Sequence, residues 1–278
     1  MDEDEDTPRP FGVLAASLWC IVSAIAMTIV VAIFDALRPG AASDLVTLTL
    51  ARVLTITAII LAVSRIHAPD TAFRTLLAAE PPKGAHVALA LALGLALCVC
   101  LGFVDERLAA ALPQTDEADH ALTEKLLAAP SPGRAAFLLV ALMVILPVCH
   151  ELLFRGIVFT GLSRLGITTG GKPTDAAITT VLLEILTVGL SGDVRGLGST
   201  IAFAVVVTYV RLTTKSLFPA LALHVAYYAS VIAIVWRPGW AEHDVPKVWA
   251  AVAAVVALVC VALLRSATRQ PLVDTVAD

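Results

Sequence analysis

Long apolar runs separated by short polar connections dominate this chain. The runs occupy residues 11–34, 45–64, 85–104, 135–163, 176–191, 197–211, 216–236 and 247–264. A helix needs about 20 apolar residues to cross about 30 Å of hydrocarbon, and most of the runs reach that length. The fifth and sixth runs are shorter and are joined only by SGDVRG, so they are either tilted helices or a re-entrant pair. The pattern predicts an all-α polytopic transmembrane helix bundle with about eight spans, within a range of seven to nine.

The composition supports the same class of protein. Hydrophobic residues make up 59% of the 278 residues and charged residues 15%, which is too little polar surface for a water-soluble globule of this size. No glycine-rich phosphate loop, basic-aromatic patch or soluble appended domain is visible. We therefore interpret residues 1–278 as a single membrane domain, and we expect the lipid bilayer and no nucleic acid as a partner.

The connections between the runs indicate an orientation. The first run follows MDEDEDTPRP, which is acidic where a signal peptide has a basic region, so we expect this run to be retained as a helix. Lys and Arg are slightly more frequent in the connections on the N-terminal side, which favours cytoplasmic termini in a cytoplasmic (inner) membrane. The connection 105–134 then lies on the opposite side, and its part after Thr123 is either an interfacial helix or a solvated connector.

Ionisable residues inside the apolar runs are the candidates for a functional site, because each costs about 2.5 to 3.5 kcal/mol to insert. Besides Arg52, they lie in CHELLFRG and at two positions further along the chain. Within CHELLFRG, Glu151 and Arg155 are four residues apart and can form an ion pair on one helix face. This pair either only locks its helix to a neighbour or also serves a site. His150 lies about 100° round the helix, and Pro147 can kink the span beside it.

Two later runs also carry a polar face. The run TTVLLEILTVGLS has a polar stripe that consists of Thr180, Glu184, Thr187 and Ser191. In SLFPALALHVAYYAS, His224, Tyr227 and Tyr228 share one face. A single Glu or His of this kind is either a packing residue with a hydrogen-bond partner or part of a site. Because three helices each offer such a face, we expect the polar groups to meet in a membrane cavity.

Two metal-binding patterns can be compared with these residues. HELLF is similar to the zincin motif HExxH, but Phe154 stands where the second histidine is needed, which argues against a zincin. His150, Glu184 and His224 would make a three-ligand zinc site with an open position, although no spacing within one helix supports it. The sequence leaves metal dependence open.

Together these motifs resemble the CPBP family of intramembrane proteases, also called the Abi or CAAX-protease family. The resemblance covers about 135–230, which we interpret as the core that contains the polar cavity. The family carries EExxxR, FxxxH and HxxxN on three membrane helices. Glu151 and Arg155 match the second glutamate and the arginine of EExxxR, and His224 matches the histidine of HxxxN. The resemblance implies a hydrolase that cleaves a peptide or membrane-protein substrate at the membrane.

The chain departs from the family motifs at three places. His150 stands where the first glutamate is expected, and Tyr228 replaces the asparagine. FxxxH falls on Glu184 to Val188, so both its phenylalanine and its histidine are missing. In the family, the first glutamate and the FxxxH histidine are thought to activate a water, while the HxxxN pair stabilises the oxyanion. Both water-activating residues are therefore changed here, and the resemblance alone does not decide whether the chain is an enzyme.

Two main hypotheses follow from these changes. In the first, the acid and the imidazole have exchanged helices, so that His150 and Glu184 activate the water while His224 and Tyr228 serve the oxyanion and Glu151–Arg155 orients the helix. In the second, the chain is a pseudoenzyme that keeps the cavity as a membrane binding or chaperone module. A small transporter or proton relay would use the same residue types, but no inverted repeat is evident.

Overall fold

The architecture is all-helical throughout the part of the chain that can be described. The computed structural model describes residues 11–69, 73–77, 80–111, 131–169, 171–189, 197–236 and 245–269, and no strand occurs in these ranges. The interfacial helix expected after Thr123 and the stripe residue Ser191 both lie outside them. The predicted class, a polytopic helical bundle, is confirmed.

Each of the eight predicted runs forms a helical pass. The single-helix passes are α1 (Val13–Leu37), α2 (Leu45–His67), α4 (Gly84–Ala111), α9 (Pro173–Gly189), α10 (Leu197–Thr214), α11 (Leu217–Trp236) and α12 (Lys247–Arg269). The fourth pass is composite and runs through α6 (Pro132–Val140), α7 (Leu146–Glu151) and α8 (Phe159–Thr169). Seven passes are long and apolar enough to cross a membrane, and α9 is the shorter eighth with 17 residues.

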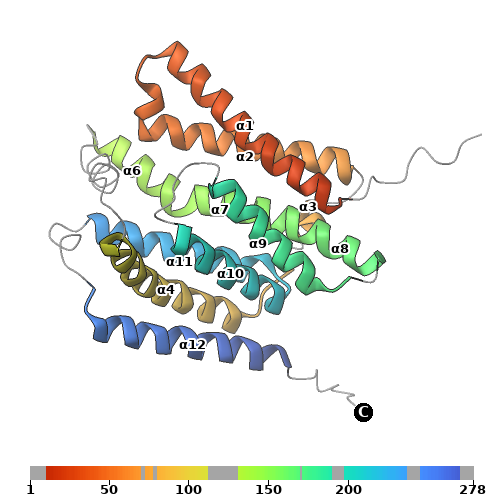
Figure 1. The fold of residues 1–278 in the computed structure, drawn as a ribbon, viewed down its shortest axis with the longest axis vertical. Helices are drawn as coiled ribbons and strands as arrows, with labels where there is room; N and C mark the ends of the chain where they lie inside the picture. The colour runs from red at the N-terminus through yellow and green to blue at the C-terminus, as the bar shows by residue number, and fades with distance from the viewer. Residues whose placement is uncertain are drawn as a thin grey trace, which may run out of the picture.

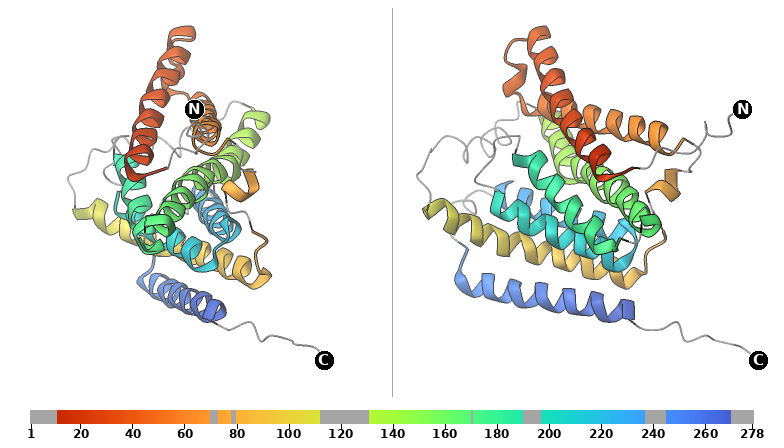
Figure 2. Two further views of the ribbon diagram at one scale, coloured as in Figure 1. Left: turned by 90° about the vertical axis from the view of Figure 1, so that its right-hand side faces the viewer. Right: turned by 45° about the vertical axis from the view of Figure 1, so that its right-hand side comes forward.

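The passes lie side by side and alternate in direction (Figure 1). The α1–α2 pair lies at one side of the bundle and α12 at the other, packed on α4, with α7, α9, α10 and α11 between them. The first turn of α1 and the last turn of α12 lie on the same side (Figure 2). This agrees with an even number of passes, whereas the side that faces the cytoplasm stays a prediction.

Local sequence explains where several helices begin and end. The side chain of Asp44 accepts from the Thr47 backbone N–H at the start of α2, and Ser131 accepts from the Arg134 N–H at the start of α6. Helix α4 continues seven residues beyond the predicted end at 104, because DERLAAA consists largely of good helix formers. The connection to α6 therefore begins later than the sequence pattern indicates.

The composite fourth pass is irregular around the polar motif. Two π-helical segments, Ala141–Ile145 and Leu152–Val158, flank α7, which has Pro147 in its first turn. Proline removes a backbone donor, and π-helical turns often occur at functional sites. This pass therefore carries the motif on the least regular stretch of the described helices.

The apolar side chains form two cores. One gathers residues mainly from α1, α2 and the α7–α9 region, and the other gathers residues from α4, α10, α11 and α12. The polar residues of the fourth pass and of α9 meet those of α10 and α11 where the two cores adjoin. The fold thus places the candidate site between its two halves.

Candidate functional site

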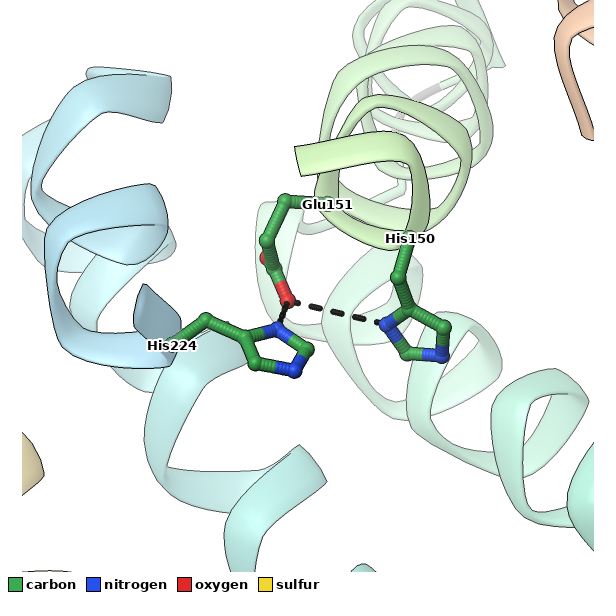
Figure 3. A group of neighbouring side chains, drawn as sticks. All are labelled: His150, Glu151 and His224. Carbon is green, nitrogen blue, oxygen red and sulfur yellow. Dashed lines mark hydrogen bonds and ion pairs between the residues drawn. The ribbon is translucent and has the colours of Figure 1, made fainter. Parts of the chain in front are cut away.

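The structure brings three helices together at the predicted polar residues. His150 and Glu151 come from α7, Arg155 from the π-helical segment that follows, Glu184 from α9 and His224 from α11. Figure 3 shows His150, Glu151 and His224 pointing toward one another. Residues separated by more than 70 positions in the chain thus form one ionisable cluster.

Glu151 is at the centre of this cluster and is completely buried. The Nδ1–H of His224 donates a 2.5 Å hydrogen bond to Glu151 Oε1. The same oxygen lies 3.4 Å from Arg155 Nη1 and 3.7 Å from His150 Nδ1. Its second oxygen, Oε2, is buried and has no hydrogen-bond partner among the described residues. One carboxylate therefore contacts both imidazoles and still has an unused oxygen.

Arg155 is also fully buried and connects two glutamates. Its Nη2 lies 2.5 Å from Glu184 Oε2, closer than the 3.4 Å that separates Nη1 from Glu151 Oε1. Its Nε donates to Thr208 Oγ1 at 3.2 Å, and Nη2 also donates to the carbonyl of Ala204 at 3.1 Å. The expected Glu151–Arg155 pair exists, but the closer partner of the guanidinium is a carboxylate on another helix.

His150 is the partly exposed member of the cluster, with 26% of its side chain accessible. Its Nε2 lies 3.5 Å from Glu184 Oε1. Its Nδ1 is buried without a hydrogen-bond partner among the described residues. The ring lies 4.8 Å from the ring of Phe154 and meets that of His224 edge-on at 5.3 Å. His150 is thus the group through which the cluster can be reached.

Tyr228 lies one turn along α11 from His224 and is 39% exposed. Its ring centre is 5.1 Å from that of His224. The third aromatic residue on this face, Tyr227, packs against Phe203 at 4.7 Å. The structure therefore places Tyr228 beside the cluster, while Tyr227 contributes to packing.

The polar stripe of α9 contributes one residue to the cluster. The hydroxyls of Thr180 and Thr187 donate to the carbonyls of Ala176 and Leu183 of their own helix, each at 2.7 Å. Glu184 is buried and reaches the cluster. Within the described part of α9, the stripe is thus mostly satisfied locally.

Arg211 of α10 is a buried residue that the sequence analysis missed. Its Nε donates to the backbone carbonyl of Arg155 at 3.2 Å, its Nη2 donates to Thr160 Oγ1 at 3.3 Å, and its guanidinium lies 5.1 Å from the ring centre of Phe159. Arg211 is the last residue of an apolar run, and an arginine at such a position is typical of the start of a loop. Its spacing of three residues from Thr208, on the same helix face, is the signal that could have placed it inward.

Three side chains of the cluster could hold a metal ion. One ligand atom from each of His150, Glu151 and His224 lies within 4.8 Å of the other two. The sequence analysis considered Glu184 in place of Glu151, but Glu184 is paired with Arg155 and approaches only His150. A cavity of about 390 Å³ lies elsewhere, between α4 and α12, and is lined by apolar side chains.

Among the described residues, seven helices long and apolar enough to span a membrane, together with the shorter α9, surround a buried His–Glu–Arg cluster, and they define an integral membrane protein with ionisable side chains inside its helix bundle. Residues 132–230 match the family described as Type II CAAX prenyl endopeptidase Rce1-like, and this stretch contains every residue of the cluster. Over this core the chain is similar to the CPBP, or CAAX protease-like, family of membrane endopeptidases. No curated protein and no solved structure matches the chain significantly.

Proposed function

We propose that this protein is an intramembrane endopeptidase in which His150 and Glu184 activate the water that attacks the peptide bond. The proposal depends mainly on one observation, the 3.5 Å separation of His150 Nε2 and Glu184 Oε1 at the partly exposed edge of the cluster. The two residues come from the helices that carry the family's water-activating pair. A distance slightly above 2.6 to 3.2 Å is common before a substrate is bound.

The contacts of the pair suggest different roles for its members. Glu184 is buried and paired with Arg155, so it reaches the water only through His150. His150 takes a proton from the water, and Glu184 orients the ring and stabilises its charged form. The resulting hydroxide attacks the peptide carbonyl carbon, and His150 then returns the proton to the leaving amine. Glu184 is therefore a positioning residue and His150 the base.

His224 and Tyr228 are proposed to stabilise the oxyanion. Glu151 holds Nδ1 of His224, and Figure 3 shows Nε2 on the opposite edge of the ring. With Nδ1–H donated to Glu151, Nε2 of His224 donates to the oxyanion only in the imidazolium form, whose charge the buried Glu151 carboxylate stabilises. The Tyr228 ring lies beside that of His224 and offers a second donor.

The substrate class follows from the location of the site. A buried cluster in a helix bundle favours a peptide that is itself anchored in the bilayer. The matching family is described as Type II CAAX prenyl endopeptidase Rce1-like. A prenylated peptide that ends in CAAX is therefore the first probe. An unlipidated transmembrane peptide tests whether the prenyl group is needed.

The test is peptide cleavage by the full chain in lipid vesicles, with product identified by mass spectrometry. Wild type should cleave a probe, and His150→Ala and Glu184→Gln should each lower the rate at least about 100-fold. Their combination should be no worse than the stronger single change, because residues that act as a unit are not additive. Glu106→Gln is the matched control, since Glu106 of α4 accepts from the Val245 backbone N–H and contacts no cluster residue within the described part of the chain.

A pseudoprotease is the second candidate, and one observation favours it. The two water-activating residues of the family are both replaced. Glu184, the acid proposed to act in their place, is already paired with Arg155 at 2.5 Å. Combining His150→Glu with Val188→His rebuilds the family pattern on the same two helices. An inactive wild type beside an active rebuilt variant would overturn the exchanged pair and identify a binding or chaperone module. If the two are both inactive, the assignment of α9 to FxxxH is wrong as well.

A further inference from the structure

We propose that Arg211 of α10 is a positioning residue, which holds the fourth pass in the π-helical register that the ionisable cluster needs. The catalytic consequence of this role rests on the proposed endopeptidase. The hold of Arg211 on the helix is a property of the fold, and it is tested separately below. Only 4% of Arg211 is exposed, so it acts through the residues that it contacts.

Arg211 contacts the fourth pass at three points. Its Nε donates to the backbone carbonyl of Arg155 at 3.2 Å, and its Nη2 donates to Thr160 Oγ1 at 3.3 Å. Its guanidinium carbon lies 5.1 Å from the ring centre of Phe159. Arg155 is in the middle of the π-helical segment Leu152–Val158, while Phe159 and Thr160 directly follow that segment. Arg211 therefore connects the middle of the segment to the first residues of α8.

The burial of Arg211 is explained by these contacts and not by an ion pair. A buried guanidinium is normally paired with a carboxylate, because desolvation of a charge without a partner is costly. Among the described residues, Arg211 forms no ion pair, and its hydrogen bonds go to a backbone carbonyl and a hydroxyl. Its donors thus serve the main chain of the fourth pass.

The same face of α10 also holds the side chain of Arg155. Ala204, Thr208 and Arg211 are spaced at i, i+4 and i+7, and all three are buried. The Ala204 carbonyl and the Thr208 hydroxyl accept from the Arg155 guanidinium, whereas Arg211 donates to the Arg155 backbone. One helix face therefore fixes both the side chain and the main chain of the residue that pairs with the two glutamates of the cluster.

The register of the π-helical segment decides where the cluster residues point. Its hydrogen bonds join residues five apart, one more than in an α-helix. If the segment relaxed to an α-helix, residues before it would turn by about 100° relative to those after it. His150 and Glu151 directly precede the segment. Loss of the Arg211 contacts would therefore let these two residues turn away from Glu184 and His224.

Two variants of Arg211 isolate the contact with the Arg155 carbonyl. Arg211→Gln places an N–H donor where arginine has Nε, while Arg211→Met reaches the same point without a donor. Thr160→Val removes only the second hydrogen bond, and it replaces Arg211→Met in the test if a thermal melt shows that this variant does not fold. Asp44→Ala is the control for lost stability, because Asp44 caps α2 and contacts no cluster residue among the described residues.

The first measurement requires no catalytic activity. Diethyl pyrocarbonate modifies histidine, and mass spectrometry of the full chain in detergent at fixed pH gives the rate at His150, with the partly exposed His67 of α2 as internal reference. Arg211→Met should change the relative rate at His150 by at least about 3-fold, since a turned ring has a different exposure. Arg211→Gln and Asp44→Ala should match wild type.

The second measurement is cleavage of the prenylated peptide in lipid vesicles. Arg211→Met should lower kcat by about 10- to 100-fold, because a displacement of about 1 Å can cost this much. KM should stay within about 2-fold, because Arg211 does not contact the substrate. Arg211→Gln should restore most of the rate.

The outcomes separate this inference from the proposed function. Equal losses in Arg211→Gln and Arg211→Met overturn the inference, as does a loss that Asp44→Ala reproduces. Unchanged modification of His150 in folded Arg211→Met and Thr160→Val overturns it as well. A wild type that cleaves no probe, together with the expected change in His150 modification, supports the hold of Arg211 and counts against the endopeptidase.

Discussion

The polar cluster and the α4–α12 interface are two contrasting ways of joining helices in this bundle. At the cluster, Arg155 connects the fourth pass to α9 and α10 through buried polar contacts. Between α4 and α12 the contact is almost entirely apolar and leaves a groove of about 390 Å³. Its lining residues are Ala92, Leu95, Ala96, Val99, Trp249, Val252, Ala253 and Val256.

The difference shows which contacts specify the arrangement of the helices. A buried charge is stable only where its partners lie, so the cluster permits one register of α7, α9 and α11. Apolar surfaces in a bilayer gain no hydrophobic energy from leaving lipid, and such helices are held mainly by close van der Waals packing. We therefore expect the cluster to be intolerant of change and the α4–α12 groove to be tolerant.

The largest expected effect is that of Arg155→Met. This change leaves Glu151 and Glu184 without their shared cation, and breaking a buried pair costs about 3 to 5 kcal/mol of unfolding free energy. Reversible unfolding in detergent measures the loss. Thr208→Val removes only one hydrogen bond to Arg155 and should cost about 1.5 to 3 kcal/mol. An Arg155→Met protein that is as stable as wild type would refute the buried placement of this pair.

A smaller effect is expected at Gly94, where α4 and α11 approach each other closely. A Cβ on Gly94 of α4 would overlap the carbonyl oxygen of Leu223 and lie 2.9 Å from the Cβ of Ala226, both on α11. Gly94→Ala should therefore force α4 and α11 apart and cost about 1 to 3 kcal/mol.

Gly102 provides the matched control on the same helix. A Cβ there meets nothing within 4 Å, so Gly102→Ala should be neutral or should stabilise α4 by up to about 1 kcal/mol. Equal effects of the two substitutions on unfolding free energy would contradict the close approach of α4 and α11. A large effect at Gly94 alone would show that close packing is confined to the face of α4 that meets α11 and does not extend to the position of Gly102.

The sequence was sufficient to predict the passes, because length and hydropathy decide whether a helix can span a membrane. It also predicted the residue types of the cluster, since buried ionisable groups are rare enough to be conspicuous. The pairing within the cluster was only partly predictable. The i,i+4 rule relates Glu151 to Arg155 on one helix, whereas the closer contact with Glu184 depends on how α9 packs.

Two further features depend on tertiary structure. Arg211 ends its apolar run, so the sequence alone does not distinguish it from a loop residue, and its inward direction is set by the carbonyl of Arg155. The apolar helices also carry weak directional information, since α4 is hydrophobic on nearly all sides. Which of its faces meets α11 and which meets α12 follows from the fit of small residues such as Gly94, which a hydropathy pattern does not resolve.

The smallest expected effect is at an ion pair on the rim of the bundle. Comparison of this partly accessible pair with the buried pairs of Arg155 distinguishes the effect of charge pairing from that of burial. Asp44 caps α2 through Thr47 and also pairs with Arg134 at the start of α6. The Asp44 and Arg134 side chains are 12% and 30% accessible. Partial burial tends to raise the pKa of Asp44, but the Thr47 hydrogen bonds and the Arg134 guanidinium together hold that pKa below its usual value. The folded state therefore binds a proton at the Asp44 carboxylate less readily than the unfolded chain does.

It follows that the contribution of Asp44 is present at neutral pH and is lost as the pH falls through the lowered pKa. Asp44→Asn keeps an oxygen to cap α2 but loses the ion pair, so it should cost less than about 1 kcal/mol. The loss should shrink in high salt, which screens a partly exposed pair, and at low pH, where Asp44 of the wild type loses its charge. Asp44→Ala removes the cap as well and should cost about 1 kcal/mol more. Unfolding of Arg155→Met in the same salt series should keep its full deficit, and a salt-sensitive deficit there would mean that the two pairs do not differ in burial.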